Sequence, residues 1–99
     1  MAMPITAMLM LYIRPECREA FIEAVGEVLL QAREEPGCLF LHAQEVVDEP
    51  GTFVLLERWR DLEEYRDVVL QQEYFKSYLE LSESMYAKPR VVTVLNPVA

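Results

Sequence analysis

His42 and Glu57 are the two residues of this sequence best suited to acid–base chemistry. His42 is the only histidine, and the two residues lie in successive apolar runs joined by the turn sequence Asp-Glu-Pro-Gly. We expect Val47 to face Thr52 across this four-residue turn, and in that register His42 lies opposite Glu57. A carboxylate can orient an imidazole as a proton acceptor. We therefore predict both as catalytic residues, although such a pair is often only structural.

The same register places further side chains beside the acid–base pair. Phe40 faces Trp59, and Gln44 faces Leu55, all on one face of the hairpin. Trp59 is the only tryptophan, and its ring can stack on an aromatic substrate while the indole N–H donates a hydrogen bond. We predict these four as substrate-binding residues. The alternative for Trp59 is a core residue that closes the end of the sheet.

The sequence contains no recognisable motif for binding a metal or a cofactor. Cys17 and Cys38 are too far apart for a CxxC motif, and a single histidine with scattered carboxylates is not a zinc or iron pattern. Neither a phosphate-binding loop nor a dinucleotide fingerprint occurs. We expect no metal, no cofactor and two reduced thiols.

Hydrophobic periodicity predicts the elements that position these residues. The run Ile5–Ile13 is apolar on both alternating faces, as in a strand covered on both sides. Apolar residues from Ala20 to Ala32 recur every three or four positions, which predicts an amphipathic helix that ends before Pro36-Gly37. Cys38–Val47 and Thr52–Trp59 are the two strands of the hairpin.

The second half of the chain predicts a helical region and a last strand. Asp61 and Glu64 have the spacing of a capping box, and Gln71-Gln72 suggests a bend. The helical region should end at Lys88-Pro89, and Val91–Leu95 reads as a strand.

This order of elements predicts an α+β fold of the ferredoxin-like βαββαβ type. A four-stranded antiparallel sheet would have both helices on one face, within a single domain spanning residues 1–99. Since the strands are apolar on both faces, a second copy of the chain should cover the other face. We expect a homodimer through the sheet face, arranged as a dimeric α/β barrel.

The charge balance excludes two classes of partner. Seventeen acidic and nine basic residues give a net charge of −8, which repels both nucleic acid and anionic membrane surfaces. The longest apolar run is too short to span a membrane and lacks the features of a signal peptide. We expect a cytoplasmic protein with no nucleic-acid or membrane partner.

Three motifs resemble those of the antibiotic biosynthesis monooxygenase family. They are Glu35-Pro36-Gly37-Cys38-Leu39, Asp48-Glu49-Pro50-Gly51-Thr52-Phe53, and Glu57-Arg58-Trp59 followed by Asp61. The resemblance covers about Ile5 to Asn96 and implies the dimeric α/β-barrel fold. It does not select one reaction, because the family includes oxygenases of polyketide phenols, haem-degrading enzymes and a sugar isomerase.

The resemblance also implies site residues. In the polyketide oxygenases a tryptophan ends the third strand and a tyrosine followed by arginine lies on the next helix, which Trp59, Tyr65 and Arg66 match. Tyr65 is therefore implied as a substrate-binding residue. The asparagine of those enzymes corresponds to Leu55, and their later arginine has no counterpart. The histidine and asparagine of the haem-degrading relatives are also missing, which disfavours haem degradation.

These observations favour a cofactor-independent monooxygenase that acts with O2 on a small electron-rich aromatic substrate, such as a phenol, an anthrone or a quinol. His42 or Glu57 would accept the phenolic proton, with Trp59 and Tyr65 as orienting groups. One alternative is an isomerase or lyase of a small polar metabolite that uses the same pair in a polar pocket. Another is a dimeric ligand-binding or stress-response module without catalysis.

Overall fold

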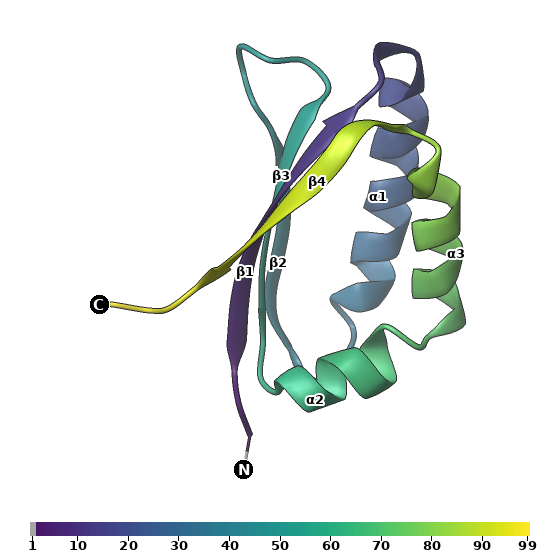
Figure 1. Ribbon diagram of the computed structural model, residues 1–99. Coiled ribbons are helices and arrows are strands. Elements are labelled where there is room, and N and C mark those ends of the chain that lie inside the picture. Colours follow the sequence, from purple (N-terminus) through teal and green to yellow (C-terminus); the bar gives the residue numbers. More distant parts are fainter. Residues whose placement is uncertain (1) are drawn as a thin grey trace.

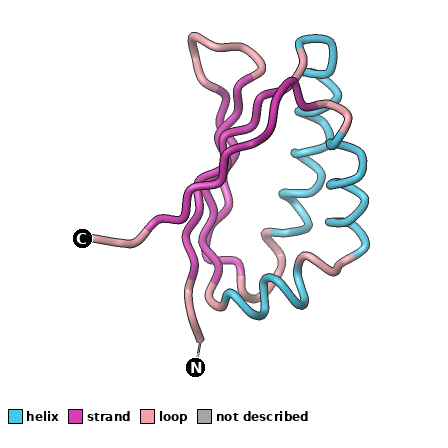
Figure 2. Tube along the Cα trace, viewed as in Figure 1, coloured by secondary structure: helices cyan, strands magenta, loops and turns pink. Residues whose placement is uncertain are grey.

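The computed structural model describes residues 2–99 as a four-stranded sheet with helices on one side (Figure 1). The strands are β1 (Ile5–Ile13), β2 (Cys38–Glu45), β3 (Thr52–Trp59) and β4 (Tyr86–Leu95). The helical segments are η1 (Pro15–Cys17), α1 (Arg18–Ala32), α2 (Leu62–Glu64), the π-helical η2 (Tyr65–Val69) and α3 (Glu73–Glu83). The sheet order is β2-β3-β1-β4 with antiparallel neighbours. Figure 2 shows the strands on one side of the molecule and the helices on the other. The predicted ferredoxin-like α+β fold is confirmed.

Alternation along β3 decides which side chains face the helices. Its odd-numbered residues, from Phe53 to Trp59, are buried, and its even-numbered residues are only half-buried. The helix α1 packs an apolar stripe against the inner face of the sheet, with residues spaced three and four apart. That stripe consists of Phe21, Ala24, Val25, Val28, Leu29 and Ala32.

The β2–β3 hairpin has a register one residue away from the expected one. His42 faces Leu56, and Glu57 faces Leu41, so the predicted pairing of His42 with Glu57 is wrong. Because successive side chains of a strand point to opposite faces, a shift of one residue moves His42 to the face without helices. Glu57 remains on the inner face.

The turn of the hairpin explains this shift. The backbone N–H of Val46, rather than Val47, pairs with the carbonyl of Thr52 at 2.9 Å, so the turn is one residue longer than expected. Gly51 has a φ of 92°, and its N–H donates to a carboxylate oxygen of Glu45 at 2.9 Å. A side-chain acceptor therefore holds the turn in its longer form.

The last strand begins earlier than expected. The helix α3 ends at Glu83 rather than at Lys88, and β4 runs from Tyr86 through Pro89. The pairing of β4 with β1 shifts register around this proline. A proline has no N–H to donate, and an edge strand with a bulge tolerates it.

The start of α2 also differs from the expectation. Asp61 occupies the N-cap position without a side-chain cap, and its carboxylate accepts instead from the backbone N–H of Met3 at 3.3 Å. Glu64 forms an ion pair with Arg60 at 2.7 Å. The bend expected at Gln71-Gln72 is confirmed, since these residues separate η2 from α3. Within residues 2–99, no helix is both long and apolar enough to cross a bilayer.

The other face of the sheet is rich in apolar side chains, and the helices of residues 2–99 all lie on the opposite side (Figure 1). Alternation assigns to this outer face Met8, Met10, Phe40, Val54, Leu56, Val91 and Leu95. Phe40 remains 36% exposed and Val91 49% exposed in the single chain. This outer face is the large apolar surface that the helices leave uncovered.

Candidate active site

A cavity of about 240 Å³ lies between the inner face of the sheet and the segments η2 and α3. Most of its wall is aliphatic or aromatic, and its polar members are Glu57, Tyr65, Tyr78, Tyr86 and Arg90. Pockets for drug-sized ligands measure roughly 300–1,000 Å³. The smaller volume suits a small aromatic ligand.

Glu57 is the only carboxylate that is buried within residues 2–99, at 7% exposure. It projects from β3 into the cavity. Burial raises its pKa, while donors on Tyr65 and Trp59 and the charge of Arg90 oppose that rise. A carboxylate made more basic by burial is a better proton acceptor than one at the surface.

Tyr65 reaches the cavity from the π-helical segment η2. The N–H of Leu70 donates to the carbonyl of Tyr65, five residues earlier, at 2.9 Å. Such widened turns are rare and occur often at functional sites. The Tyr65 ring packs on Trp59 with 4.9 Å between the ring centroids, and burial, followed by the charge of Glu57, raises the pKa of its hydroxyl. The hydroxyl therefore stays protonated and can donate a hydrogen bond.

Two buried donors have no hydrogen-bond partner within residues 2–99. They are the indole Nε1 of Trp59 and the hydroxyl of Tyr78. The indole N–H of Trp59 therefore forms no hydrogen bond with the carboxylate of Glu57. Burial raises the pKa of Tyr78, so its hydroxyl remains a donor at neutral pH. Since an unpaired buried donor costs about 1–3 kcal/mol, the Tyr78 hydroxyl, which lines the cavity, favours a bound ligand or water.

Three of the predicted site residues line the cavity together. Leu55 and Glu57 come from β3, and Tyr65 comes from η2. Trp59 is 1% exposed and packs behind this group against Tyr65, without lining the cavity itself. Leu55, Glu57 and Trp59 therefore lie together on the inner face of β3, as predicted.

The other three predicted site residues lie on the outer face of the sheet. His42, Phe40 and Gln44 are all exposed there, away from Glu57. The rings of Phe40 and His42 stack with 5.7 Å between their centroids. The expectation that the six hairpin residues share one face failed for these three, because it depended on the hairpin register.

Sequence reasoning missed three polar residues of the cavity. Tyr78 and Tyr86 both fall in the region expected to be helical, where tyrosines at helical spacing usually serve packing, but Tyr86 belongs to β4. Arg90 was assigned to no element. Its signal was the alternation Arg90, Val92, Val94 on one face of a strand, which becomes visible only once the strand is extended through Pro89.

Potential metal ligands do not gather in one place. Within residues 2–99, no three His, Cys, Asp or Glu side chains lie where they could hold a metal ion together. Cys17 and Cys38 are half-buried free thiols.

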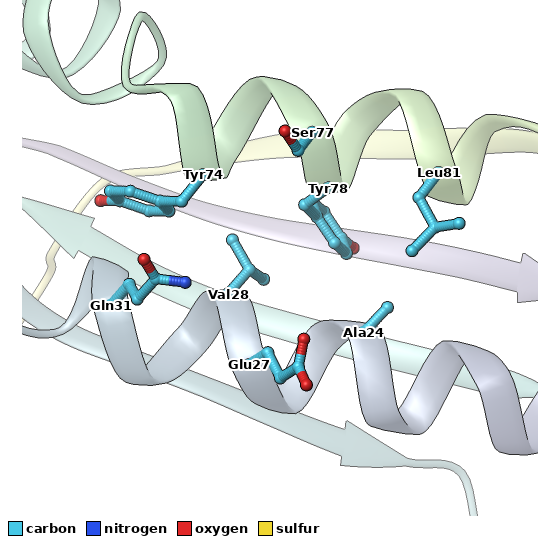
Figure 3. Close-up of a pocket in the computed structure, with 8 residues that line it drawn as sticks. All are labelled: Ala24, Glu27, Val28, Gln31, Tyr74, Ser77, Tyr78 and Leu81. Atoms are coloured by element: carbon cyan, nitrogen blue, oxygen red, sulfur yellow. The ribbon is translucent and has the colours of Figure 1, made fainter.

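A second hollow of about 200 Å³ lies between α1 and α3 (Figure 3). Tyr78 reaches from α3 toward Val28 and Ala24 of α1, and Glu27 and Gln31 form part of the rim. Tyr78 thus separates this groove from the inner cavity, because it lines both. The charged and amide groups of the groove are exposed, so the inner cavity is the stronger candidate for an active site.

The sequence matches the family described as antibiotic biosynthesis monooxygenase over residues 4–81. The chain belongs to this family. It is 29% identical over 82 residues to an uncharacterised protein of Synechocystis, and 37% identical over 49 residues to YcnE of Bacillus subtilis. These matches cover 83% and 50% of this chain, and 55% and 52% of the relatives, so the chain spans about half the length of the curated relatives it matches.

Solved structures have the same fold over the whole chain. The Mycobacterium tuberculosis protein Rv0793 superposes with a TM-score of 0.87 at 26% identity, over 98% of this chain and 97% of that one. The Pseudomonas aeruginosa protein PA3566 has the same TM-score at 21% identity, over 100% and 98% of the two chains.

Proposed function

We propose that this protein is a monooxygenase of small electron-rich aromatic substrates, such as phenols, anthrones or quinols, that uses O2 without a metal or an organic cofactor. The observation that carries the proposal is Glu57, a buried carboxyl whose pKa is raised, in a cavity with aromatic and aliphatic walls. Family membership supports an oxygenase. The cavity wall supports an aromatic substrate.

The first step is removal of a phenolic proton by the Glu57 carboxylate. A phenol has a pKa near 10, far above that of a free glutamate, so this transfer is uphill for an ordinary carboxylate. Burial raises the pKa of Glu57 and thus narrows the difference between its pKa and that of the phenol. The hydroxyl of Tyr65 and the aromatic walls orient the ring, while the apolar cavity excludes water.

The phenolate then supplies the electrons for the reaction with O2. Transfer of one electron gives a phenoxyl radical and superoxide, which combine to form a carbon–oxygen bond at a ring carbon that carries hydrogen. The peroxide takes the proton held by Glu57. Loss of the C–H proton and cleavage of the O–O bond then give a quinone carbonyl and water. The substrate provides all four electrons, so no reductant is required.

The isomerase alternative has lost its basis. It required His42 and Glu57 as an acid–base pair in a polar pocket, and these residues lie on opposite faces of the sheet. The predicted catalytic role of His42 has no support from its position. A module that binds ligands without catalysis is distinguished from an oxygenase by the experiment below.

We also propose that the enzyme is a homodimer joined through the outer face of the sheet. This face carries methionine, leucine, valine and phenylalanine side chains that one chain leaves partly open to water. Two sheets pack face to face at about 10 Å when their side chains interdigitate. A second copy supplies the complementary apolar surface.

The test is oxygen uptake by chelator-treated protein with a panel of hydroquinones, naphthols and anthrones. We expect uptake together with formation of a quinone that contains one oxygen atom more than the substrate, and a loss of about 10²–10⁴-fold in kcat for Glu57→Gln because the proton acceptor is removed. Glu80→Gln, on the exposed side of α3, is the matched control and should keep the full rate. No uptake with any member of the panel, or full activity of Glu57→Gln, contradicts the proposal.

A further inference from the structure

Arg90 is the one arginine within residues 2–99 that has neither a hydrogen bond nor an ion pair. The other arginines each donate to a carboxylate, a hydroxyl or a backbone carbonyl, and they are Arg14, Arg18, Arg33, Arg58, Arg60 and Arg66. A guanidinium offers five N–H donors in a planar fork. In Arg90 all five are free to bind another group.

The strand β4 directs Arg90 toward the cavity. Val92 pairs with Leu9 and lines the cavity, so Arg90, two residues earlier, lies on the same face. The register shift beside Pro89 bends the strand at this point. Bulges of this kind often re-aim a side chain near a functional site.

Arg90 stands where the inner cavity meets a depression on the protein surface. The depression lies at the end of α3, and Leu79 and Tyr86 line it as well as the cavity. Glu83 is the only carboxylate in the lining of the depression, and it forms no ion pair with Arg90 within the described chain. A ligand with its ring in the cavity can therefore reach Arg90 at the mouth.

The charge of Arg90 acts inside the cavity. Burial raises the pKa of Glu57, Tyr65 and Tyr78, and the positive charge of Arg90 opposes the rise at all three groups. The chain as a whole carries a net charge of −8 and repels anions. Arg90 is thus a local site of attraction for an anion at the entrance to an apolar cavity.

We propose that the cavity takes an aromatic carboxylate, with the ring between the sheet and α3 and the carboxylate bound by the guanidinium of Arg90. This inference rests on the proposed function and narrows its substrates to phenols that carry a carboxylate at the end of the ring system remote from the hydroxyl. The hydroxyl meets Glu57 at the inner end. The two parallel N–H donors of a guanidinium match the two oxygens of a carboxylate.

The test compares a naphthol with the hydroxynaphthoate that carries its carboxylate on the second ring, using isothermal titration calorimetry under nitrogen. A hydrogen-bonded charge pair contributes about 1.5–3 kcal/mol, so the wild type should bind the hydroxynaphthoate about tenfold or more tightly than the naphthol. Arg90→Gln should remove this preference, because it weakens the binding of the hydroxynaphthoate much more than that of the naphthol. Arg90→Lys keeps the positive charge but loses the two parallel N–H donors of the guanidinium, so it should retain part of the preference for the hydroxynaphthoate.

Arg66→Gln is the matched control, because it removes the same charge from a surface arginine that pairs with Asp67. It should keep the full preference. Equal affinity of the wild type for both ligands, equal weakening of both by Arg90→Gln, or no binding of either ligand overturns the inference. Oxygen uptake with neutral phenols alone would leave the proposed function standing and overturn only the role of Arg90.

Discussion

Glu57, the proposed proton acceptor, also makes the fold sensitive to pH. Burial raises its pKa above the ordinary value of 4.5, so the protonated carboxyl favours the folded state. This contribution is complete below pH 4.5 and is lost as the pH rises through the pKa of the folded state. The ionised side chain therefore weakens the fold at pH values above the pKa of the folded state.

We predict that Glu57→Gln is more stable than the wild type at pH 8 and that the difference shrinks toward pH 4. The amide cannot ionise, so it avoids the cost of a buried charge at high pH. Urea unfolding at several pH values measures the difference in the free energy of unfolding. A wild type as stable as the variant at pH 8, or a difference that does not change with pH, would contradict the role of burial.

Gly51 has a steric reason to be glycine in the motif Asp48–Phe53. Its φ of 92° is unfavourable for other residues, and an added Cβ would lie 2.9 Å from the carbonyl oxygen of Ile13. We predict that Gly51→Ala lowers the free energy of unfolding by about 1–3 kcal/mol. Gly26 in α1 is the matched control, because an added Cβ there meets no atom within 4 Å.

Gly26→Ala should stabilise the protein by about 0.5–1 kcal/mol, since alanine is the better helix former. Thermal unfolding of the two variants thus gives shifts of opposite sign. A Gly51→Ala protein as stable as the wild type would show that the turn relaxes without strain.

Single residues differ in how well the sequence predicts their place. Leu55, Glu57 and Trp59 alternate within one strand, so they share a face whatever the register of the hairpin. Tyr65 was found through its distance from Trp59 in a family motif. Arg90 could not be found in this way, because the proline before it reads as a helix end, while on an edge strand the missing N–H is not needed.

The hairpin shows why element registers are harder to predict than elements. Both strands were expected, but their register depends on contacts made after the chain has folded. The carboxylate of Glu45 accepts from the N–H of Gly51 and from Arg18 at 2.7 and 2.8 Å, and Arg18 lies 27 residues away in α1. No local pattern in residues 45–52 contains this long-range interaction. The predicted pairing of His42 failed for this reason.

We predict that the Glu45 network makes the hairpin sensitive to acid. The hydrogen bonds from Arg18, followed by the one from Gly51, lower the pKa of Glu45 from 4.5 to about 2. A lowered pKa means that the stabilisation is present above pH 4.5 and is lost as the pH falls toward 2. Glu45→Gln should therefore have a lower Tm than the wild type at pH 7, with the two values converging near pH 2.

Glu19→Gln provides the control for this comparison. Glu19 also contacts Arg18, but its side chain is 85% exposed, and exposed ion pairs contribute little. Its Tm should stay close to that of the wild type at pH 7. If Glu45→Gln were as stable as the wild type at that pH, the network would not hold the turn.

In the whole molecule the two faces of the sheet have different surroundings. The helices cover the inner face of the sheet and leave a cavity beside β4 that contains Glu57. The outer face carries no helix, and its apolar side chains are available for association (Figure 1). A sheet that is apolar on both sides could be recognised from Ile5–Ile13, because that run is apolar at both odd and even positions. The cavity could not be recognised from the sequence, because its presence depends on which side chains of the core leave a gap when they pack.

We predict that the wild type has twice the 11.5 kDa mass of one chain by light scattering at micromolar concentration. Leu56→Glu, at the centre of the outer face opposite His42, should shift the protein to a monomer, because it places a charge in an apolar sheet-to-sheet interface. Leu30→Glu is the matched control on α1, where the leucine is 66% exposed, and it should remain dimeric. Circular dichroism of both variants separates dissociation from misfolding. A wild type that is monomeric at this concentration contradicts association through the outer face, whatever the two variants do.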